Sequence, residues 1–284
     1  MPSQRADHWR LRERVLDCPT RPLLMGIVNV TPDSFSDGGR YLDSDAAVAH
    51  GLELVSQGAD LLDIGGESTR PYSEEVSESE ELRRVLPVIE RLAEQVEVPL
   101  SIDTAKPGVA REALAAGAEV VNDVTGLTDP SMIEVAAQSN AAVCAMHMRG
   151  TPRTMQDDPV YDDVLVEVFD FLRGRRDALM EAGIEQDRIA LDPGIGFGKT
   201  TEHNLRLLRN TDRFYELGCP ILVGHSRKRF IGELLGDAEV DRTAGTIGVA
   251  LALAQQRVQI LRIHDVGAVR HALLLFEAAG QLES

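Results

Sequence analysis

Polar side chains follow the apolar runs of this chain in a regular way. The first is Asn29, which interrupts the run Leu23–Val30 just before a loop that begins at Thr31. An amide gives an aliphatic strand no packing benefit, and burying it costs free energy unless it is hydrogen-bonded. Similar groups follow seven further runs, and these groups include Asp63, Asp103, Asn122, His147, Asp192, Lys228, and Arg262 with His264. A single Asp at a strand end is most often a helix cap or a turn residue, but eight such ends favour a functional site.

Three of these groups suit a flat nitrogen heterocycle. Asp103 and Asp192 offer carboxylates, which accept two parallel N–H bonds from a guanidine-like edge, and Asn122 offers an amide that both donates and accepts. Taken one at a time, Asp103 and Asn122 could equally cap a helix or hold a turn. Together they predict recognition of a heterocyclic ring.

A second set of groups is cationic or donates hydrogen bonds: Arg70, Lys228, Arg262 and His264. Several cations at one mouth of an acidic protein would hold a diphosphate or a carboxylate, and would stabilise charge on a leaving group. Any one Arg considered alone would be assigned to a surface ion pair.

The glycine-rich stretch 194–200 superficially resembles a phosphate-binding P-loop. It lacks that motif because Pro193 stands where the motif needs Gly. We expect its glycines to let the backbone turn beside Asp192, with Phe197 offering a ring to a ligand and Lys199 in a structural role. Met146 is most simply a core residue, although it could form a soft wall beside a heterocycle. No nucleophile elbow is visible, so the sequence does not support covalent hydrolysis.

The eight apolar runs predict the elements that position these groups. Most runs are continuously aliphatic, as in parallel strands buried on both faces, and helical patterns separate them. This alternation predicts a (β/α)₈ TIM barrel, in which the strand ends converge on one active-site face. A doubly wound sheet is the alternative, but no Gly-x-Gly-x-x-Gly follows the first strand. The runs are Leu23–Val30, Leu61–Gly66, Pro99–Thr104, Val120–Val124, Ala142–His147, Ile189–Asp192, Pro220–Gly224 and Ile260–Val266.

Residues 1–21 precede the first barrel strand, and we expect Trp9–Leu16 to form a hairpin that caps the bottom of the barrel. Residues 22–284 then form one catalytic domain. The net charge of −17 disfavours nucleic acid and anionic membranes as partners. The sequence has three widely spaced cysteines without a metal-binding pattern, no signal-peptide h-region and no apolar run of membrane-spanning length, and these features predict a soluble cytoplasmic protein.

Eight stretches of the chain, in order, resemble the dihydropteroate synthases, a family of pterin-binding TIM barrels. The resemblance implies condensation of 6-hydroxymethyl-7,8-dihydropterin diphosphate with 4-aminobenzoate to 7,8-dihydropteroate and pyrophosphate in folate biosynthesis. It also implies Mg²⁺, a homodimer and a sulfonamide target. The stretches are Met25–Gly39, Gly58–Pro71, Ser101–Thr104, Val121–Val124, Met146–Pro152, Leu191–Lys199, Gly224–Phe230 and Arg262–Val266.

The resemblance also implies roles for individual residues. Catalysis and pterin binding would fall to Asp103, Asp192 and Lys228, with Asn122 holding the pterin and Met146 and Phe197 lying beside its ring. Asn29, Arg70, Arg262 and His264 would hold the diphosphate, and Asn29 would also hold Mg²⁺. The mobile loops and the aminobenzoate site would include Phe35, Thr69, Pro71, Ser226 and Arg229.

Two positions depart from the family pattern. Tyr72 stands where Gly usually follows the Arg-Pro of the second loop, and Arg229 stands where Ser is frequent. Arg229 could bind the aminobenzoate carboxylate or could face solvent.

Two other functions are compatible with parts of this pattern. A methyltetrahydrofolate–corrinoid methyltransferase would share Asp103, Asn122 and Asp192 but would not need the diphosphate-binding cations. A non-catalytic paralogue that binds a pterin or a partner is favoured only by Tyr72.

Overall fold

The computed structural model describes residues 5–31, 40–69 and 73–282. Eight parallel strands form its centre, and each coincides with one of the predicted apolar runs. Their side chains are almost all buried, which explains why the runs are aliphatic rather than alternating. The strands are β3 (Leu23–Asn29), β4 (Leu61–Gly65), β5 (Leu100–Asp103), β6 (Val120–Asp123), β7 (Ala142–Met146), β8 (Ile189–Asp192), β9 (Leu222–Val223) and β10 (Ile260–Ile263).

The strands close into a barrel. Hydrogen-bonded neighbours follow the order β8-β7-β6-β5-β4-β3-β10-β9, and every pairing is parallel. The two ends of this order meet at a parallel bridge between Leu191 and Ile221, where the Leu191 N–H also donates to the Pro220 carbonyl at 2.9 Å. A doubly wound sheet would leave two open edges, so the predicted TIM barrel is confirmed.

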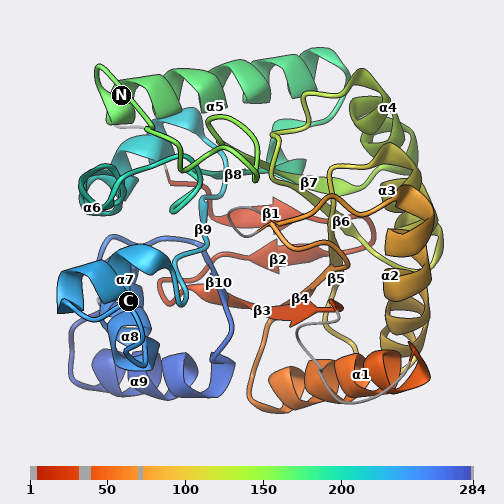
Figure 1. Ribbon diagram of the computed structural model, residues 1–284, viewed down its shortest axis with the longest axis horizontal. Helices are drawn as coiled ribbons and strands as arrows, with labels where there is room; N and C mark the ends of the chain where they lie inside the picture. The colour runs from red at the N-terminus through yellow and green to blue at the C-terminus, as the bar shows by residue number, and fades with distance from the viewer. Residues whose placement is uncertain (1–4, 32–39, 70–72, 283–284) are drawn as a thin grey trace.

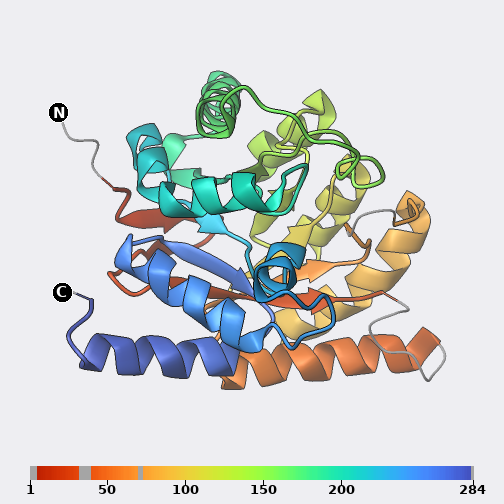
Figure 2. The ribbon, with the colours of Figure 1, turned by 60° about the vertical axis from the view of Figure 1, so that its left-hand side comes forward.

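Helices surround the barrel in chain order, from α1 at the lower right of Figure 1 round to α7, α8 and α9 at the lower left, and Figure 2 shows them from another side. Local signals begin several of them: Ser77 and Asp129 accept N–H groups of the first turns of α2 and α4, and Pro107 opens α3. The helices are α1 (Arg40–Ser56), α2 (Glu78–Ala93), α3 (Pro107–Ala115), α4 (Pro130–Ser139), α5 (Val164–Glu181), α6 (Thr201–Arg209), α7 (Arg229–Leu235), α8 (Thr243–Gln255) and α9 (Val266–Ala278), with 3-10 turns η2 (Gln186–Arg188) and η3 (Thr211–Leu217).

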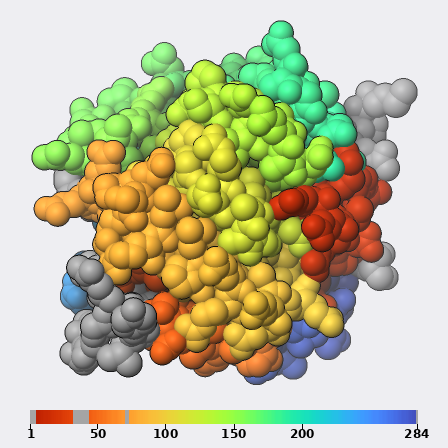
Figure 3. Space-filling view, turned by 90° about the vertical axis from the view of Figure 1, so that its right-hand side faces the viewer, coloured from red at the N-terminus to blue at the C-terminus, as the bar shows by residue number. Residues whose placement is uncertain are grey.

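The predicted amino-terminal hairpin is present. Strands β1 (His8–Arg10) and β2 (Val15–Asp17) pair antiparallel, and Figure 3 shows the hairpin, in red, at the edge of the face built by α2, α3 and α4. Trp9 is fully buried in a cluster with residues near the amino-terminal ends of the barrel strands, such as Met25 and Leu61. Its indole N–H donates to the Arg188 carbonyl at 3.1 Å. The hairpin therefore covers the amino-terminal end of the barrel and leaves the carboxyl-terminal end open for a site.

None of the helices in the described part of the chain combines the length and hydropathy that crossing a lipid bilayer requires.

Candidate active site

The carboxyl-terminal ends of the barrel strands bring most of the predicted site residues to one face. Because all eight strands run parallel, the side chains that end them gather at this mouth. Asn29 ends β3, Asp103 ends β5 and Met146 ends β7, while Asn122 and Asp123 end β6. Asp192 ends β8, and Arg262 lies within β10, one residue before its end.

One carboxylate, Asp63 of β4, links the middle of this mouth. Its Oδ2 accepts the Arg262 Nε–H at 2.6 Å and the Asn122 Nδ2–H at 3.0 Å. Arg262 also donates through Nη2 to Asp103 Oδ2 at 2.7 Å. Asp63 is fully buried, whereas Asp103 and Arg262 are partly accessible from the mouth. The network thus joins β4, β5, β6 and β10.

The charges in this network are interleaved rather than separated. From the sequence, Arg262 belonged to a cationic set and Asp103 to a carboxylate set, yet the two side chains are in direct contact. Burial raises the pKa of Asp103 to about 7, while the nearby Arg262 guanidinium acts in the opposite direction and favours the carboxylate. The mouth can therefore offer an acceptor and a cation to neighbouring parts of one ligand.

Asp192 sits at the start of the glycine-rich turn. The Gly194 N–H donates to its Oδ1 at 2.7 Å, and burial raises the pKa of Asp192 to about 6. Gly194 has a φ of +68°, and a Cβ there would lie 1.9 Å from the His147 carbonyl oxygen. Only glycine fits this approach, as the sequence predicted for a turn beside Asp192.

Lys228 and Phe197 face each other across this turn. The Lys228 ammonium lies 4.0 Å from the centre of the Phe197 ring, a cation–π geometry. Burial lowers the pKa of Lys228 to about 8, with Arg262 adding to the effect. Phe197 and Met146 belong to a small apolar cluster with Val124 and Met155. This cluster provides an apolar wall beside the polar network.

Lys199 takes the structural role expected of it. Its buried ammonium donates to the Phe197 carbonyl at 2.9 Å and lies 2.9 Å from His147 Nδ1, so it ties the turn to the end of β7. Burial lowers the pKa of Lys199 to about 7 and that of His147 to about 2, which favours a neutral imidazole beside the lysine.

The remaining described candidates are His264, Ser226, Asn29, Thr69 and Arg229. His264 Nδ1 is 3.0 Å from the Ser226 hydroxyl, which also accepts the His264 N–H. Asn29 and Thr69 are half-buried. Arg229, in contrast, is exposed and pairs with Glu233 one turn further along α7, at 2.7 Å. Phe35, Arg70, Pro71 and Tyr72 lie outside the described residues.

Sequence reasoning missed two features. Asp63 was recognised as a polar group of a strand but was not assigned to the site; an acid inside an otherwise aliphatic run was the available signal. The second is a partly buried ion cluster, in which Lys106 donates to Glu67 at 2.5 Å and to the fully buried Glu81 at 2.7 Å. Glu67 also accepts the Val76 N–H at 2.9 Å and so joins the two ends of the β4–α2 connection.

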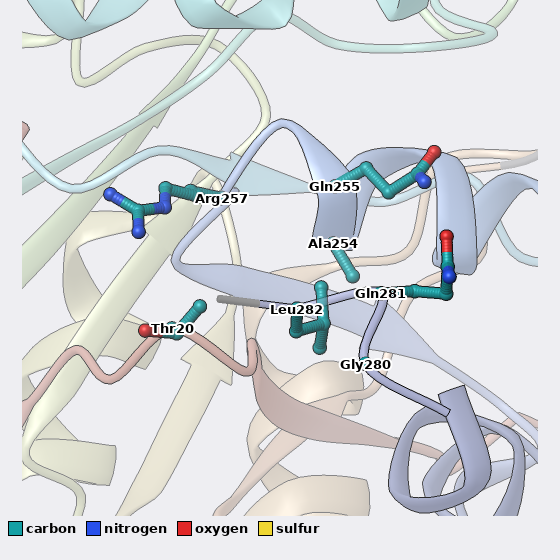
Figure 4. Close-up of a pocket in the computed structure, with 7 residues that line it drawn as sticks. All are labelled: Thr20, Ala254, Gln255, Arg257, Gly280, Gln281 and Leu282. Carbon is teal, nitrogen blue, oxygen red and sulfur yellow. The ribbon is translucent and has the colours of Figure 1, made fainter. Parts of the chain in front are cut away.

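A separate hollow of about 440 Å³ lies at the other end of the barrel (Figure 4). Its lining comes from the segment before β3, the end of α8 and the segment after α9, all at the amino-terminal side of the strands. In this fold that end serves stability rather than catalysis. The lining residues are Thr20, Ala254, Gln255, Arg257, Gly280, Gln281 and Leu282.

Comparisons with known proteins agree with this geometry. Residues 25–264 match the model of a family described as pterin binding enzyme. The dihydropteroate synthase of Escherichia coli strain K12 is 45% identical over 259 residues, covering 91% of this chain and 92% of that protein.

Solved structures give the same result. The Xanthomonas albilineans dihydropteroate synthase with 4-aminobenzoic acid is 50% identical, with a TM-score of 0.90 and coverage of 97% of this chain and 98% of that one. The same enzyme in complex with 7,8-dihydropteroate is 48% identical, with a TM-score of 0.87 and coverage of 96% of this chain and 98% of that one. The Yersinia pestis dihydropteroate synthase, solved with a sulfonamide drug, is 44% identical, with a TM-score of 0.89 and coverage of 96% of this chain and 99% of that one.

Proposed function

This chain belongs to the family of pterin-binding enzymes, and within it to the dihydropteroate synthases, and on that premise we propose how the mouth of the barrel performs the reaction. The chain is a transferase that condenses 6-hydroxymethyl-7,8-dihydropterin diphosphate with 4-aminobenzoate to 7,8-dihydropteroate and pyrophosphate. The residue roles that follow are our proposal.

The pterin ring lies over the buried network. Asp103 and Asp192 accept N–H groups of the pterin, Asn122 adds an amide contact, and Lys228 donates to a ring acceptor. Asn122 and Asp192 are buried, and Asp103 and Lys228 are partly buried, which supports this assignment because hydrogen bonds in a site shielded from water discriminate strongly between ligands. Met146 and Phe197 flank the ring and supply apolar contact.

The diphosphate lies beside Arg262, His264 and Asn29. Arg70 keeps the diphosphate-binding role that the family resemblance implies, and it lies outside the described residues. Contact between Arg262 and Asp103 supports this arrangement, since it places a cation immediately next to the pterin acceptor. Among the described residues no cluster of three or more His, Cys, Asp or Glu side chains could hold a metal ion. A Mg²⁺ site built from Asn29 and substrate oxygens fits this finding, because Mg²⁺ usually binds few protein ligands plus phosphate oxygens. The ion would neutralise charge on the departing diphosphate.

In the chemical step the bond from the pterin methylene carbon to the diphosphate oxygen breaks, and the amine nitrogen of 4-aminobenzoate bonds to that carbon. The oxygen keeps the electron pair, and the amine loses one proton to water or to pyrophosphate. Cations on the diphosphate side stabilise the leaving anion, and carboxylates on the pterin side stabilise the positive charge left on the ring. No strong general base is needed, because the arylamine attacks an electron-poor carbon.

We assign Ser226 and Thr69 to the binding of 4-aminobenzoate. Phe35 and Pro71 keep the role that the family resemblance implies, and both lie outside the described residues. The exposure of Arg229 and its pairing with Glu233 favour a solvent-facing role over binding of the aminobenzoate carboxylate.

Pyrophosphate release tests the proposed function. It should require both the pterin diphosphate and 4-aminobenzoate, and chelation of divalent metal with EDTA should abolish it until Mg²⁺ is restored. A corrinoid-dependent methyltransferase would release no pyrophosphate, and a non-catalytic paralogue would bind the pterin without turnover. Either result with folded protein would refute the assignment.

The homodimer is also a proposal. Helix α8 has no charged residue, yet Ala244, Gly248 and Ala252 on its outer face are exposed. Leu234 and Leu235 of the neighbouring α7 are 55% and 56% exposed. An apolar helix face of this kind is usually covered, and a second copy of the chain would cover it. Light scattering should give twice the chain mass, and a monomer at micromolar concentration would contradict the proposal.

A cytoplasmic location is proposed as well, because Cys18, Cys144 and Cys219, all in the described part of the chain, are buried and free.

A further inference from the structure

Asp63 occupies an unusual position in the network, because it serves the site without access to it. Its side chain is fully buried, so a substrate at the mouth does not reach it. One oxygen, Oδ2, accepts hydrogen bonds from both Arg262 and Asn122. The other oxygen, Oδ1, is buried and lacks a hydrogen-bond partner in the described part of the chain. A buried acceptor without a hydrogen-bond partner destabilises the fold. We therefore expect the role of Asp63 to lie in the two contacts made by its Oδ2.

The first contact decides which way the Asn122 amide faces. An amide has one end that only donates and one that only accepts. With Nδ2 donating to Asp63, the Oδ1 of Asn122 is left to accept from a ligand. A rotated amide would place its oxygen against the Asp63 carboxylate, where neither group could donate. Asp63 therefore fixes the pattern of donor and acceptor that Asn122 presents.

The second contact divides the Arg262 guanidinium between two acids. Its Nε–H points to Asp63 while its Nη2 points to Asp103, at 2.6 and 2.7 Å. Without Asp63, two N–H groups of Arg262 would be available to Asp103, and bidentate pairing is the favoured geometry of a guanidinium with a carboxylate. Such pairing would occupy both oxygens of Asp103, the residue assigned to the pterin.

We propose that Asp63 is a positioning residue for pterin recognition, which orients the Asn122 amide and keeps Arg262 from occupying both oxygens of Asp103. This inference rests on the proposed function and extends it to a residue that does not touch the substrate.

Calorimetric binding of 6-hydroxymethyl-7,8-dihydropterin, which lacks the diphosphate, tests the inference on the whole 284-residue chain. Asp63→Ala should bind this pterin at least tenfold more weakly than wild type, and its KM for the pterin diphosphate should rise while the KM for 4-aminobenzoate stays within twofold. The pterin affinity of Asp63→Asn should lie between those of wild type and Asp63→Ala, at least threefold below wild type. The amide oxygen of Asn still accepts both hydrogen bonds but no longer forms an ion pair with Arg262. A residue that only supported the fold would not separate the two KM values.

Ser101→Ala is the matched control. Ser101 is the cross-strand partner of Asp63 on β5, is fully buried, and has a hydroxyl without a partner among the described residues. Its loss should leave pterin affinity unchanged, and a loss equal to that of Asp63→Ala would overturn the inference.

Wild-type affinity in a folded Asp63→Ala protein would also overturn it. If that variant does not fold, Asp63→Asn decides, with unchanged affinity counting against the inference. Failure of the wild-type protein to bind the pterin would instead refute the proposed function, and the inference with it.

Discussion

Replacing Arg262 with Met should destabilise the fold in a way that depends on pH. Arg262 is the cation between two acids, Asp63 and Asp103, the first of which is fully buried. Methionine fills similar space without a charge, so the substitution leaves both acids without their ion-pair partner. Removing one partner of a buried pair typically costs about 3–5 kcal/mol, which is a large part of the about 5–15 kcal/mol that stabilises a folded domain.

The pH dependence follows from Asp103. Burial raises its pKa to about 7, and Arg262 opposes that rise. Without Arg262 the pKa of Asp103 in the folded state moves higher still. The Asp103 carboxyl of the folded variant therefore stays protonated to a higher pH than that of folded wild type. The folded variant then binds more protons than its unfolded chain, and its free energy of unfolding falls relative to wild type above about pH 7. The slope is about 1.4 kcal/mol per pH unit for one proton.

Urea denaturation at pH 6 and pH 8.5 measures this effect. We expect the Arg262→Met cost to be larger at pH 8.5 by about 1–2 kcal/mol. Arg229→Met, which removes an exposed pair with Glu233, should change stability by less than about 1 kcal/mol at either pH. An equal cost for Arg262→Met at both pH values would refute the reasoning.

Three other perturbations address the site, the hairpin and the ion cluster. The kcat/KM for the pterin diphosphate should fall below about pH 7, as Asp103 and then Asp192 gain a proton, and above about pH 8, as Lys228 loses one; a flat profile between pH 5 and 9 would argue against their roles. Trp9→Ala should cost about 3–5 kcal/mol in urea denaturation but leave pterin affinity within twofold, and a parallel loss of affinity would contradict a purely structural hairpin. Lys106→Met leaves the buried Glu81 without its cation and should lower stability by about 3 kcal/mol in the same assay, a prediction that a change below about 1 kcal/mol would exclude.

The barrel could be predicted from the sequence because its signal is local. Each strand is a short aliphatic run, and burial on both faces produces such runs whatever the neighbours are. The hairpin was predictable for a similar reason, since Trp9, Leu11 and Leu16 are large apolar residues in a segment rich in Arg and acidic residues.

The contacts within the site could not be predicted in this way. Arg262 meets Asp63 and Asp103 across 199 and 159 residues of chain, and no spacing in the sequence specifies which strand ends touch. Asp63 is the single acid of an otherwise aliphatic run, and it contacts Asn122 and Arg262 because closure of the barrel brings β4, β6 and β10 together. From the sequence, Arg229 could bind the aminobenzoate carboxylate or face solvent. In the structure it pairs with Glu233, one turn further along α7.

Pterin binding by wild type and Asp192→Ala, measured by calorimetry with 6-hydroxymethyl-7,8-dihydropterin, tests the central claim most directly. Asp192 is buried at the end of β8 and is held by the Gly194 N–H, so it is placed to bind the ring. We expect wild type to bind the pterin and folded Asp192→Ala to show no measurable binding. Unchanged affinity in that variant would mean that the pterin does not bind at the carboxyl-terminal mouth of the barrel.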